Sequence, residues 1–156
     1  MDFKTLANQY RNELLDNVLP FWLEHSQDLE FGGYFTCLDR KGGVFDTDKF
    51  IWLQGREVWM FSMLYNKVEK RQEWLDCAVQ GGEFLKKYGH DGNYNWYFSL
   101  DRSGRPLVEP YNIFSYTFAT MAFGQLSLAT GNQEYADIAK KTFEIILSKV
   151  DNPKGK

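Results

Sequence analysis

The chain has 156 residues, enough for one compact domain, with a net charge of −3, 44% hydrophobic residues and 25% charged residues. Basic and acidic residues are interspersed, without the basic run that suits nucleic acids or anionic membranes. No apolar stretch is long enough to cross a bilayer, and the first residues lack the pattern of a secretory signal. These features favour a cytoplasmic protein with neither nucleic-acid nor membrane partners.

The first half of the chain predicts one helix, one hairpin and two further helices. The expected bounds are a helix over 3–24, a strand over 34–38, a turn over 39–43, a returning strand at 44–45, and helices over 53–68 and 72–88. Apolar residues lie on one stripe of the first helix, at Leu6, Tyr10, Leu14, Val18 and Trp22. The second helix is apolar almost all round, so we expect it to be buried on most sides.

The second half predicts the same order of elements. The expected bounds are a strand over 96–100, a turn over 101–104, a helix over 112–130 that is again apolar almost all round, an amphipathic helix over 133–149 and a final loop over 151–156. Within the chain, Gly81-Gly82 is expected to be a close-packing point of the third helix. The two cysteines, Cys37 and Cys77, lack metal-ligand spacing and are expected to be reduced, packed thiols.

An internal repeat relates the two halves at an offset of 62 residues. The offset brings Tyr34-Phe35 onto Trp96-Tyr97, Leu38-Asp39-Arg40 onto Leu100-Asp101-Arg102, Gly42 onto Gly104, Phe61 onto Phe123 and Leu64 onto Leu126. Each unit is a hairpin, an apolar helix and an amphipathic helix, which predicts an inner and an outer helical layer. The sequence therefore predicts an all-α fold of the α/α toroid class.

Two units and a leading helix do not close a toroid, so we expect an incomplete arc of about five helices with short β-hairpins between them. We interpret residues 1–156 as the N-terminal portion of a single domain. Such an arc should expose apolar surface, and the isolated chain should self-associate or be only marginally stable. The alternative is a small open α-solenoid that is complete in itself. That solenoid needs a polar capping face, which the helix over 112–130 lacks.

Arg56 departs from the repeat, because its equivalent in the second unit is Phe118. A residue that breaks the local pattern is expected at a functional site, and a guanidinium at the mouth of a toroid can hold an anion, an enolate oxygen or a sugar hydroxyl. The structural alternative is an ion pair with Glu57 or Asp48 that ties the hairpin to the helix. Trp52 lies one turn before Arg56 and is expected to face the same cavity. The aromatic surplus of the chain, thirteen Phe, nine Tyr and five Trp, also suits stacking against sugar rings.

Three stretches resemble the N-acylglucosamine 2-epimerase family. They are more similar to its N-acetylglucosamine branch than to the cellobiose 2-epimerases. They are Lys49–Ser62 with WLQGR at its centre, Glu109–Ser115 followed by Phe118-Ala119 and Leu128–Asn132, and Asn152–Lys156. The resemblance covers essentially the whole chain. It implies an (α/α)6 barrel well over twice this length. The implied activity interconverts N-acetylglucosamine and N-acetylmannosamine, by removal and return of the C2 proton on the ring-opened sugar.

The resemblance also implies roles for single residues. Arg56 would hold the substrate oxygen and the developing negative charge, and Phe114 would line the sugar pocket. The family's acid and base are histidines from inner helices beyond Lys156, so the isolated chain should be inactive. His25 and His90 match no catalytic motif and are expected at the surface. The resemblance implies a small amino sugar as substrate and no required metal or cofactor. It also implies stimulation by ATP in some members, and we expect the full-length protein to be a homodimer.

Two other functions fit the same fold. A glycoside hydrolase needs two carboxylates at a defined separation; Asp46, Asp48 and Glu109 lie near the predicted hairpin ends, but no pair stands out. A non-catalytic carbohydrate- or protein-binding member is the other possibility, since some relatives in the family are also known as renin-binding proteins.

Overall fold

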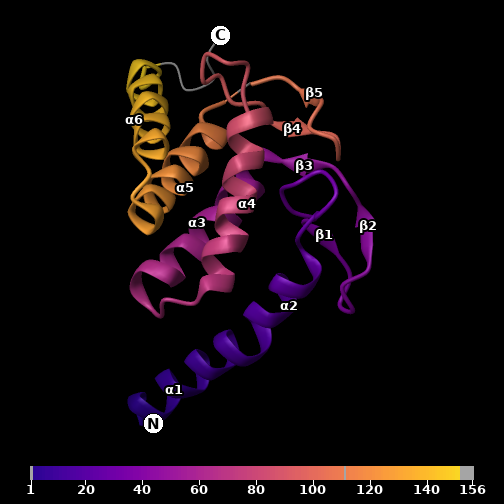
Figure 1. The fold of residues 1–156 in the computed structure, drawn as a ribbon, viewed down its shortest axis with the longest axis vertical. Helices are drawn as coiled ribbons and strands as arrows, with labels where there is room; N and C mark the ends of the chain where they lie inside the picture. Colours follow the sequence, from indigo (N-terminus) through magenta and orange to yellow (C-terminus); the bar gives the residue numbers. More distant parts are fainter. Residues whose placement is uncertain (1, 111, 152–156) are drawn as a thin grey trace.

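The computed structural model describes residues 2–110 and 112–151 (Figure 1). The elements are α1 (Phe3–Glu13), the π-helical turn η1 (Leu14–Val18), α2 (Leu19–His25), β1 (Cys37–Leu38), β2 (Val44–Asp46), β3 (Lys49–Phe50), α3 (Ile51–Lys67), α4 (Gln72–Tyr88), β4 (Ser99–Leu100), β5 (Pro106–Val108), α5 (Phe114–Thr130) and α6 (Gln133–Ser148). The five predicted helices are all present. The final loop predicted over 151–156 lies, apart from Asp151, outside the described residues.

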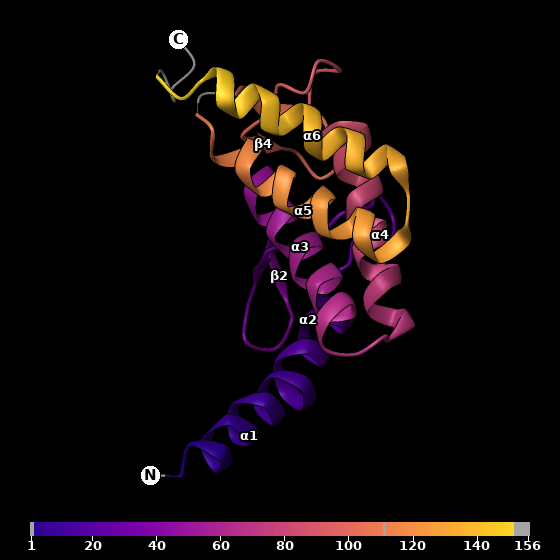
Figure 2. The ribbon, with the colours of Figure 1, turned by 90° about the vertical axis from the view of Figure 1, so that its left-hand side faces the viewer.

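The leading helix is helical over its predicted length but contains a π-helical turn. Asp2 caps its start, with Oδ1 accepting the backbone N–H of Lys4 at 3.1 Å. The π-helical turn immediately precedes the segment that carries Pro20, whose nitrogen has no hydrogen to donate and whose ring crowds the carbonyl four residues earlier. Figures 1 and 2 both show α1 extending away from the packed helices, and Tyr10 on its apolar stripe is 71% exposed.

The two hairpins have the same register, displaced by the predicted 62 residues. The paired residues are Cys37 with Asp46 and Leu38 with Val44 in the first, and Ser99 with Val108 and Leu100 with Pro106 in the second. Gly42 and Gly104 occupy equivalent turn positions with φ of 84° and 95°, a left-handed conformation that favours glycine. The repeat predicted from the sequence is therefore confirmed in both hairpins.

The strands differ from the prediction in length and number. Only the last two residues of each predicted first strand pair with the return strand, because Tyr34 and Trp96 instead form isolated bridges to Gln27 and His90. Strand β3 was missed: it precedes α3 directly and pairs with β4 of the second hairpin. Strand β5 was missed as well, although it occupies the position equivalent to β2. The short β3 links the first unit to the second at the start of α3.

The helices form two layers, as the repeat predicted. Helix α3 packs against α5, while α4 packs against α3 and α6 against α5. Figures 1 and 2 show α3 and α5 side by side, with α4 and α6 outside them. Large rings from the helices and from the segment before β4 are fully buried in the core, namely Phe61, Trp74, Trp96 and Phe123. The inner helices α3 and α5 thus carry the residues whose positions matter for a site.

The predicted close-packing point in α4 is confirmed. A Cβ atom at Gly81 would overlap the ring of Tyr34, whose hydroxyl donates to the carbonyl of Cys77 at 2.7 Å. We expect Gly81→Ala to lower the free energy of unfolding by about 1–3 kcal/mol through overpacking. Gly124→Ala is the matched control, because nothing lies within 4 Å of its Cβ position, and it should raise stability by up to about 1 kcal/mol. Urea denaturation of both variants measures the difference, and equal effects would contradict the packing described.

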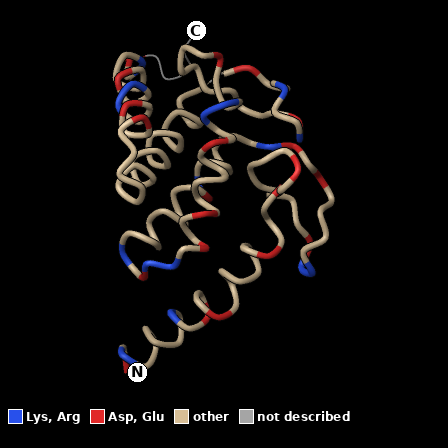
Figure 3. Tube along the Cα trace, viewed as in Figure 1, with Lys and Arg blue, Asp and Glu red and all other residues tan. Residues whose placement is uncertain are grey.

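An apolar surface is exposed on the inner and outer helices of the second unit. Helix α5 contains no charged residue, and it appears as an uncharged stretch in Figure 3. Exposed apolar side chains on these two helices are Phe114, Met121 and Leu128 on α5, and Phe143 and Leu147 on α6. The expectation of exposed apolar surface is confirmed. Self-association or marginal stability of the isolated chain, which this surface favours, stays a prediction.

Candidate active site

Arg56 projects from the second turn of α3 and is exposed. Its guanidinium carbon lies 5.7 Å from the ring centroid of Phe118 on α5. Among residues 2–110 and 112–151, no ion pair involves Arg56, so the predicted structural alternative of a pair with Glu57 or Asp48 is wrong. Exposure without a counter-ion leaves the N–H groups of this guanidinium free to bind an anion or a polar ligand.

Phe118, which lies beside Arg56, belongs to a cluster of three aromatic rings. Trp52 lies 6.1 Å from Phe114 and 5.9 Å from Phe118, and the two phenylalanine rings are 5.5 Å apart, all measured between centroids. Phe114 is 55% exposed at the start of α5. Phe118 contacts Arg56, and Trp52 and Phe114 pack against Phe118, so this ring links the three residues that the sequence selected. An exposed ring such as Phe114 suits a polyhydroxylated ligand with apolar C–H faces.

A groove of about 290 Å³ adjoins Arg56 on the first unit. Its lining residues are Trp22, Thr36, Leu53, Arg56, Glu57 and Met60. The Thr36 hydroxyl is buried there, and no residue of the described chain is within hydrogen-bonding distance of it. Arg56 therefore lies between an apolar groove on one side and the aromatic cluster on the other.

Glu57 is a buried carboxyl in the wall of this groove. The Ser26 hydroxyl lies 2.6 Å from the Trp22 carbonyl and 2.5 Å from Glu57 Oε1. Burial raises the pKa of Glu57 to about 8, although the hydrogen bond to Ser26 opposes that rise. The Ser26 hydroxyl donates to Glu57 Oε1, a bond that favours the ionised carboxylate, whereas burial favours the neutral acid and has the larger effect. Glu57 and Arg56 are consecutive in α3, so their side chains leave the helix in different directions.

Replacing Glu57 with glutamine should stabilise the chain at pH 8. Since its pKa in the folded state is about 8 against an ordinary value of 4.5, the unfolded state ionises first and wild-type stability falls as pH rises between these values. The total loss is on the order of 3–5 kcal/mol. Glu57→Gln has no ionisable group at this position, and its amide oxygen can still accept from the Ser26 hydroxyl. Urea denaturation at pH 5 and pH 8 gives the change in the free energy of unfolding with pH for the wild type and for Glu57→Gln. Equal changes in the two proteins would show that Glu57 is ionised in the folded chain.

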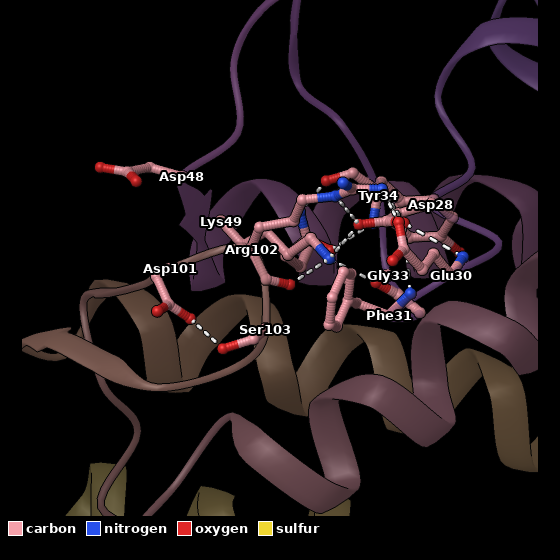
Figure 4. A network of polar contacts seen from close by, with 12 residues as sticks. Asp28, Glu30, Phe31, Gly33, Tyr34, Asp48, Lys49, Asp101, Arg102 and Ser103 are labelled. Carbon is pink, nitrogen blue, oxygen red and sulfur yellow. Dashed lines mark hydrogen bonds and ion pairs between the residues drawn. The ribbon is translucent and has the colours of Figure 1, made fainter.

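A buried ion cluster supports the start of α3 and was not predicted from the sequence. Lys49 and Asp28 both have fully buried side chains, with Nζ to Oδ2 at 2.9 Å. Lys49 Nζ also donates to the carbonyls of Gly32 and Arg102. Arg102 donates to both oxygens of Asp28 at 3.0 Å, and its Nη2 lies 2.9 Å from Glu30 Oε2. Figure 4 shows these side chains converging on Asp28, while Asp48 lies apart from them.

The charges of this cluster are held by their mutual contacts. Burial alone would raise the pKa of Asp28, but hydrogen bonds from Arg102 and Lys49 lower it to about 2. Burial lowers the pKa of Lys49, and Asp28 opposes that change. The cluster joins the loop after α2, strand β3 and the turn of the second hairpin. It therefore fixes the direction in which α3 leaves β3, and with it the position of Arg56.

The two histidines lie outside both the groove and the aromatic cluster. His90 stacks on Tyr94 and meets the edge of Trp96, each at 4.8 Å between centroids, and burial lowers its pKa. His25 packs against Phe21 at 4.9 Å. The prediction that both are surface residues is wrong in part, because aromatic neighbours cover each ring to an intermediate degree.

In the described part of the chain, no three His, Cys, Asp or Glu side chains are grouped as metal ligands, and no helix has the length and apolarity to cross a membrane. Both cysteines are free, with Cys77 buried and Cys37 half-buried.

Comparison with known proteins identifies the family. The model of the N-acylglucosamine 2-epimerase (GlcNAc 2-epimerase) family matches residues 33–156. The chain belongs to this family. It is 44% identical to the N-acylglucosamine 2-epimerase of Bos taurus over 146 residues, and 28% identical to the cellobiose 2-epimerase of Dictyoglomus turgidum over 158 residues. The predicted closeness to the N-acetylglucosamine branch agrees with these identities.

The matched region is a limited share of these relatives. The bovine alignment covers 90% of this chain and 35% of the relative, and the Dictyoglomus alignment covers 99% and 40%. Among solved structures, the cellobiose 2-epimerase of Bacillus thermoamylovorans superposes with a TM-score of 0.84 and 31% identity, over 93% of this chain and 37% of that one. Cellobiose 2-epimerases are (α/α)6 barrels, so the six helical segments form an incomplete arc of that fold.

Proposed function

We propose that the whole protein is a sugar 2-epimerase that interconverts N-acetylglucosamine and N-acetylmannosamine. The observation that carries the proposal is Arg56, a cation on an inner helix that is exposed, has no counter-ion in the described chain and lies over the ring of Phe118, against which Trp52 and Phe114 pack. Relatives that are 44% identical to the chain carry the name N-acylglucosamine 2-epimerase, which supports this reaction over others that use the same fold.

The chemistry of the reaction explains why a cation is needed. Opening the sugar ring places a carbonyl at C1 and makes the neighbouring C2 proton removable. Its removal leaves an enolate of the 2-acetamido aldehyde, with negative charge on the C1 oxygen, and returning a proton to the opposite face inverts C2. In this proposal the guanidinium of Arg56 binds the C1 oxygen and stabilises its developing negative charge. Trp52 and Phe114 line the pocket against the C–H face of the sugar.

The proton transfers are assigned outside this chain. Family resemblance places them on two histidines from later inner helices, and neither His25 nor His90 lies in the groove or the cluster. Residues 1–156 alone should therefore be inactive. By the same resemblance, the whole protein needs no cofactor, forms a homodimer and acts on a small amino sugar, and some members of the family are stimulated by ATP. The charge pattern and the few cysteines favour the cytoplasm.

The test is product identification. The protein translated from the complete reading frame that contains this sequence is incubated with N-acetylglucosamine, and sugars are separated by chromatography. N-acetylmannosamine is the expected product, and cellobiose and mannose run in parallel should remain unchanged. Conversion of cellobiose or mannose alone would overturn the substrate assignment. Sugar binding without any conversion would favour the non-catalytic binding protein.

A further inference from the structure

Helices α3 and α5 approach closely where α3 has a glycine. A Cβ atom at Gly55 would lie 3.0 Å from the backbone carbon and oxygen of Phe118. That distance is shorter than ordinary van der Waals contact, so a larger residue at position 55 would push the helices apart. Gly55 immediately precedes Arg56, and the close approach therefore brings the Phe118 ring to the guanidinium of the next residue.

The contact between Phe118 and Arg56 is a cation–π interaction. The guanidinium carbon is 5.7 Å from the ring centroid, within the roughly 6 Å over which such an interaction is significant. A ring face contacts the guanidinium without forming a hydrogen bond to it. Phe118 can therefore hold the cation while its N–H donors stay available for a ligand oxygen.

The ring of Phe118 is itself fixed by neighbouring rings. Trp52 contacts it at 5.9 Å from α3, and Phe114 contacts it at 5.5 Å from one turn earlier on α5. Phe118 is half-buried, whereas Arg56 is exposed and has many rotamers. A fixed ring beneath a flexible cation restricts where that cation points.

We propose that Phe118 is a positioning residue that holds Arg56 in the orientation needed to bind the anionic oxygen of the substrate. The inference deepens the proposed epimerase function and rests on it. Phe118 does not touch the reacting atoms; it acts through Arg56, and Gly55 provides the close helix approach that makes the contact possible.

A double-mutant cycle in the protein from the complete reading frame tests this inference. Phe118→Leu should lower kcat/KM for N-acetylglucosamine by roughly tenfold, with most of the loss in kcat. Phe118→Tyr keeps an aromatic ring at this position and should retain most of the wild-type activity. In the Arg56→Ala background, Phe118→Leu should cause almost no further loss, because Phe118 acts through Arg56. Phe143→Leu, a change to an exposed ring on α6, is the matched control and should leave activity unchanged.

Additive losses in the cycle, or full activity of Phe118→Leu, would overturn the inference. A wild-type protein without epimerase activity would instead refute the proposed function, and the contact itself then remains testable. In NMR spectra of residues 1–156, the Arg56 side-chain protons should be shifted upfield by the ring and should return to ordinary positions in Phe118→Leu. Unshifted protons in the wild type would contradict the contact, even where the leucine variant fails to fold.

Discussion

Replacing Arg56 with alanine should lower kcat/KM for the epimerisation of N-acetylglucosamine by about 10²–10³-fold, which is the usual cost of losing one preorganised group at a developing oxyanion. Arg56 is free of ion pairs in the described chain, so its charge is available for the substrate. Arg56→Lys keeps the charge but loses the planar fork, and it should recover only part of the activity. Steady-state kinetics of the protein from the complete reading frame give both values.

Arg40→Ala is the control for this prediction, because Arg40 is exposed in the first hairpin turn. Its kcat/KM should equal that of the wild type. An Arg56→Ala variant with unimpaired epimerisation would refute the assigned role. Hydrolysis of a glycoside that survives the same substitution would support a carboxylate pair and the hydrolase alternative.

Replacing Asp28 with asparagine should lower the free energy of unfolding by about 3–5 kcal/mol, because it leaves the buried Lys49 without its charged partner. The remaining ligands of Lys49 would be two carbonyl oxygens, and Arg102 would lose its two-oxygen contact with the carboxylate. Urea denaturation of the protein from the complete reading frame measures the change. Asp39→Asn is the control: Asp39 caps an exposed turn through the N–H groups of Lys41 and Gly43. It should cost less than about 1 kcal/mol.

The pH dependence of stability separates the charge of Asp28 from its shape. The pKa of Asp28 is about 2 in the folded chain, below the value of about 3.9 expected when unfolded. Its stabilising contribution is therefore present above pH 4 and lost as pH falls from 4 towards 2. The free energy of unfolding of Asp28→Asn should lack this fall between pH 4 and pH 2. If the free energy of unfolding falls equally between pH 4 and pH 2 in the wild type and in Asp28→Asn, the Asp28 carboxylate is not held by Arg102 and Lys49.

The helices and the repeat followed from the sequence because their signals are local. Apolar spacing predicted the helix over 72–88 to the residue, and Gly42 and Gly104 marked equivalent turns. Helix starts were less accurate: α3 begins at Ile51 rather than Leu53, because β3 leads into it without an intervening loop. Such junctions depend on pairing with β4, which lies some fifty residues further along the chain.

The sequence predicted which residues belong to the candidate site, but not the contacts that hold them in place. Arg56 departs from the repeat, and the family resemblance added Phe114. The Asp28 cluster carried no comparable signal, because Lys49 and Arg102 lie 21 and 74 residues from Asp28 and each looks like an ordinary surface charge. Phe118 was recognised as the repeat counterpart of Arg56 and as part of the family resemblance, but not as a contact of Arg56. Its contact with the guanidinium depends on the helix approach at Gly55, which spacing alone does not specify.

The most direct test of the account is deuterium incorporation at C2 of N-acetylmannosamine in heavy water, measured by NMR. Residues 1–156 and the protein from the complete reading frame are compared at equal concentration. We predict exchange with the complete protein alone, which would support C2 proton transfer by residues outside 1–156. Exchange by residues 1–156 would contradict that assignment and point to His25, His90 or another residue of this chain. Exchange by neither protein would contradict the epimerase function itself.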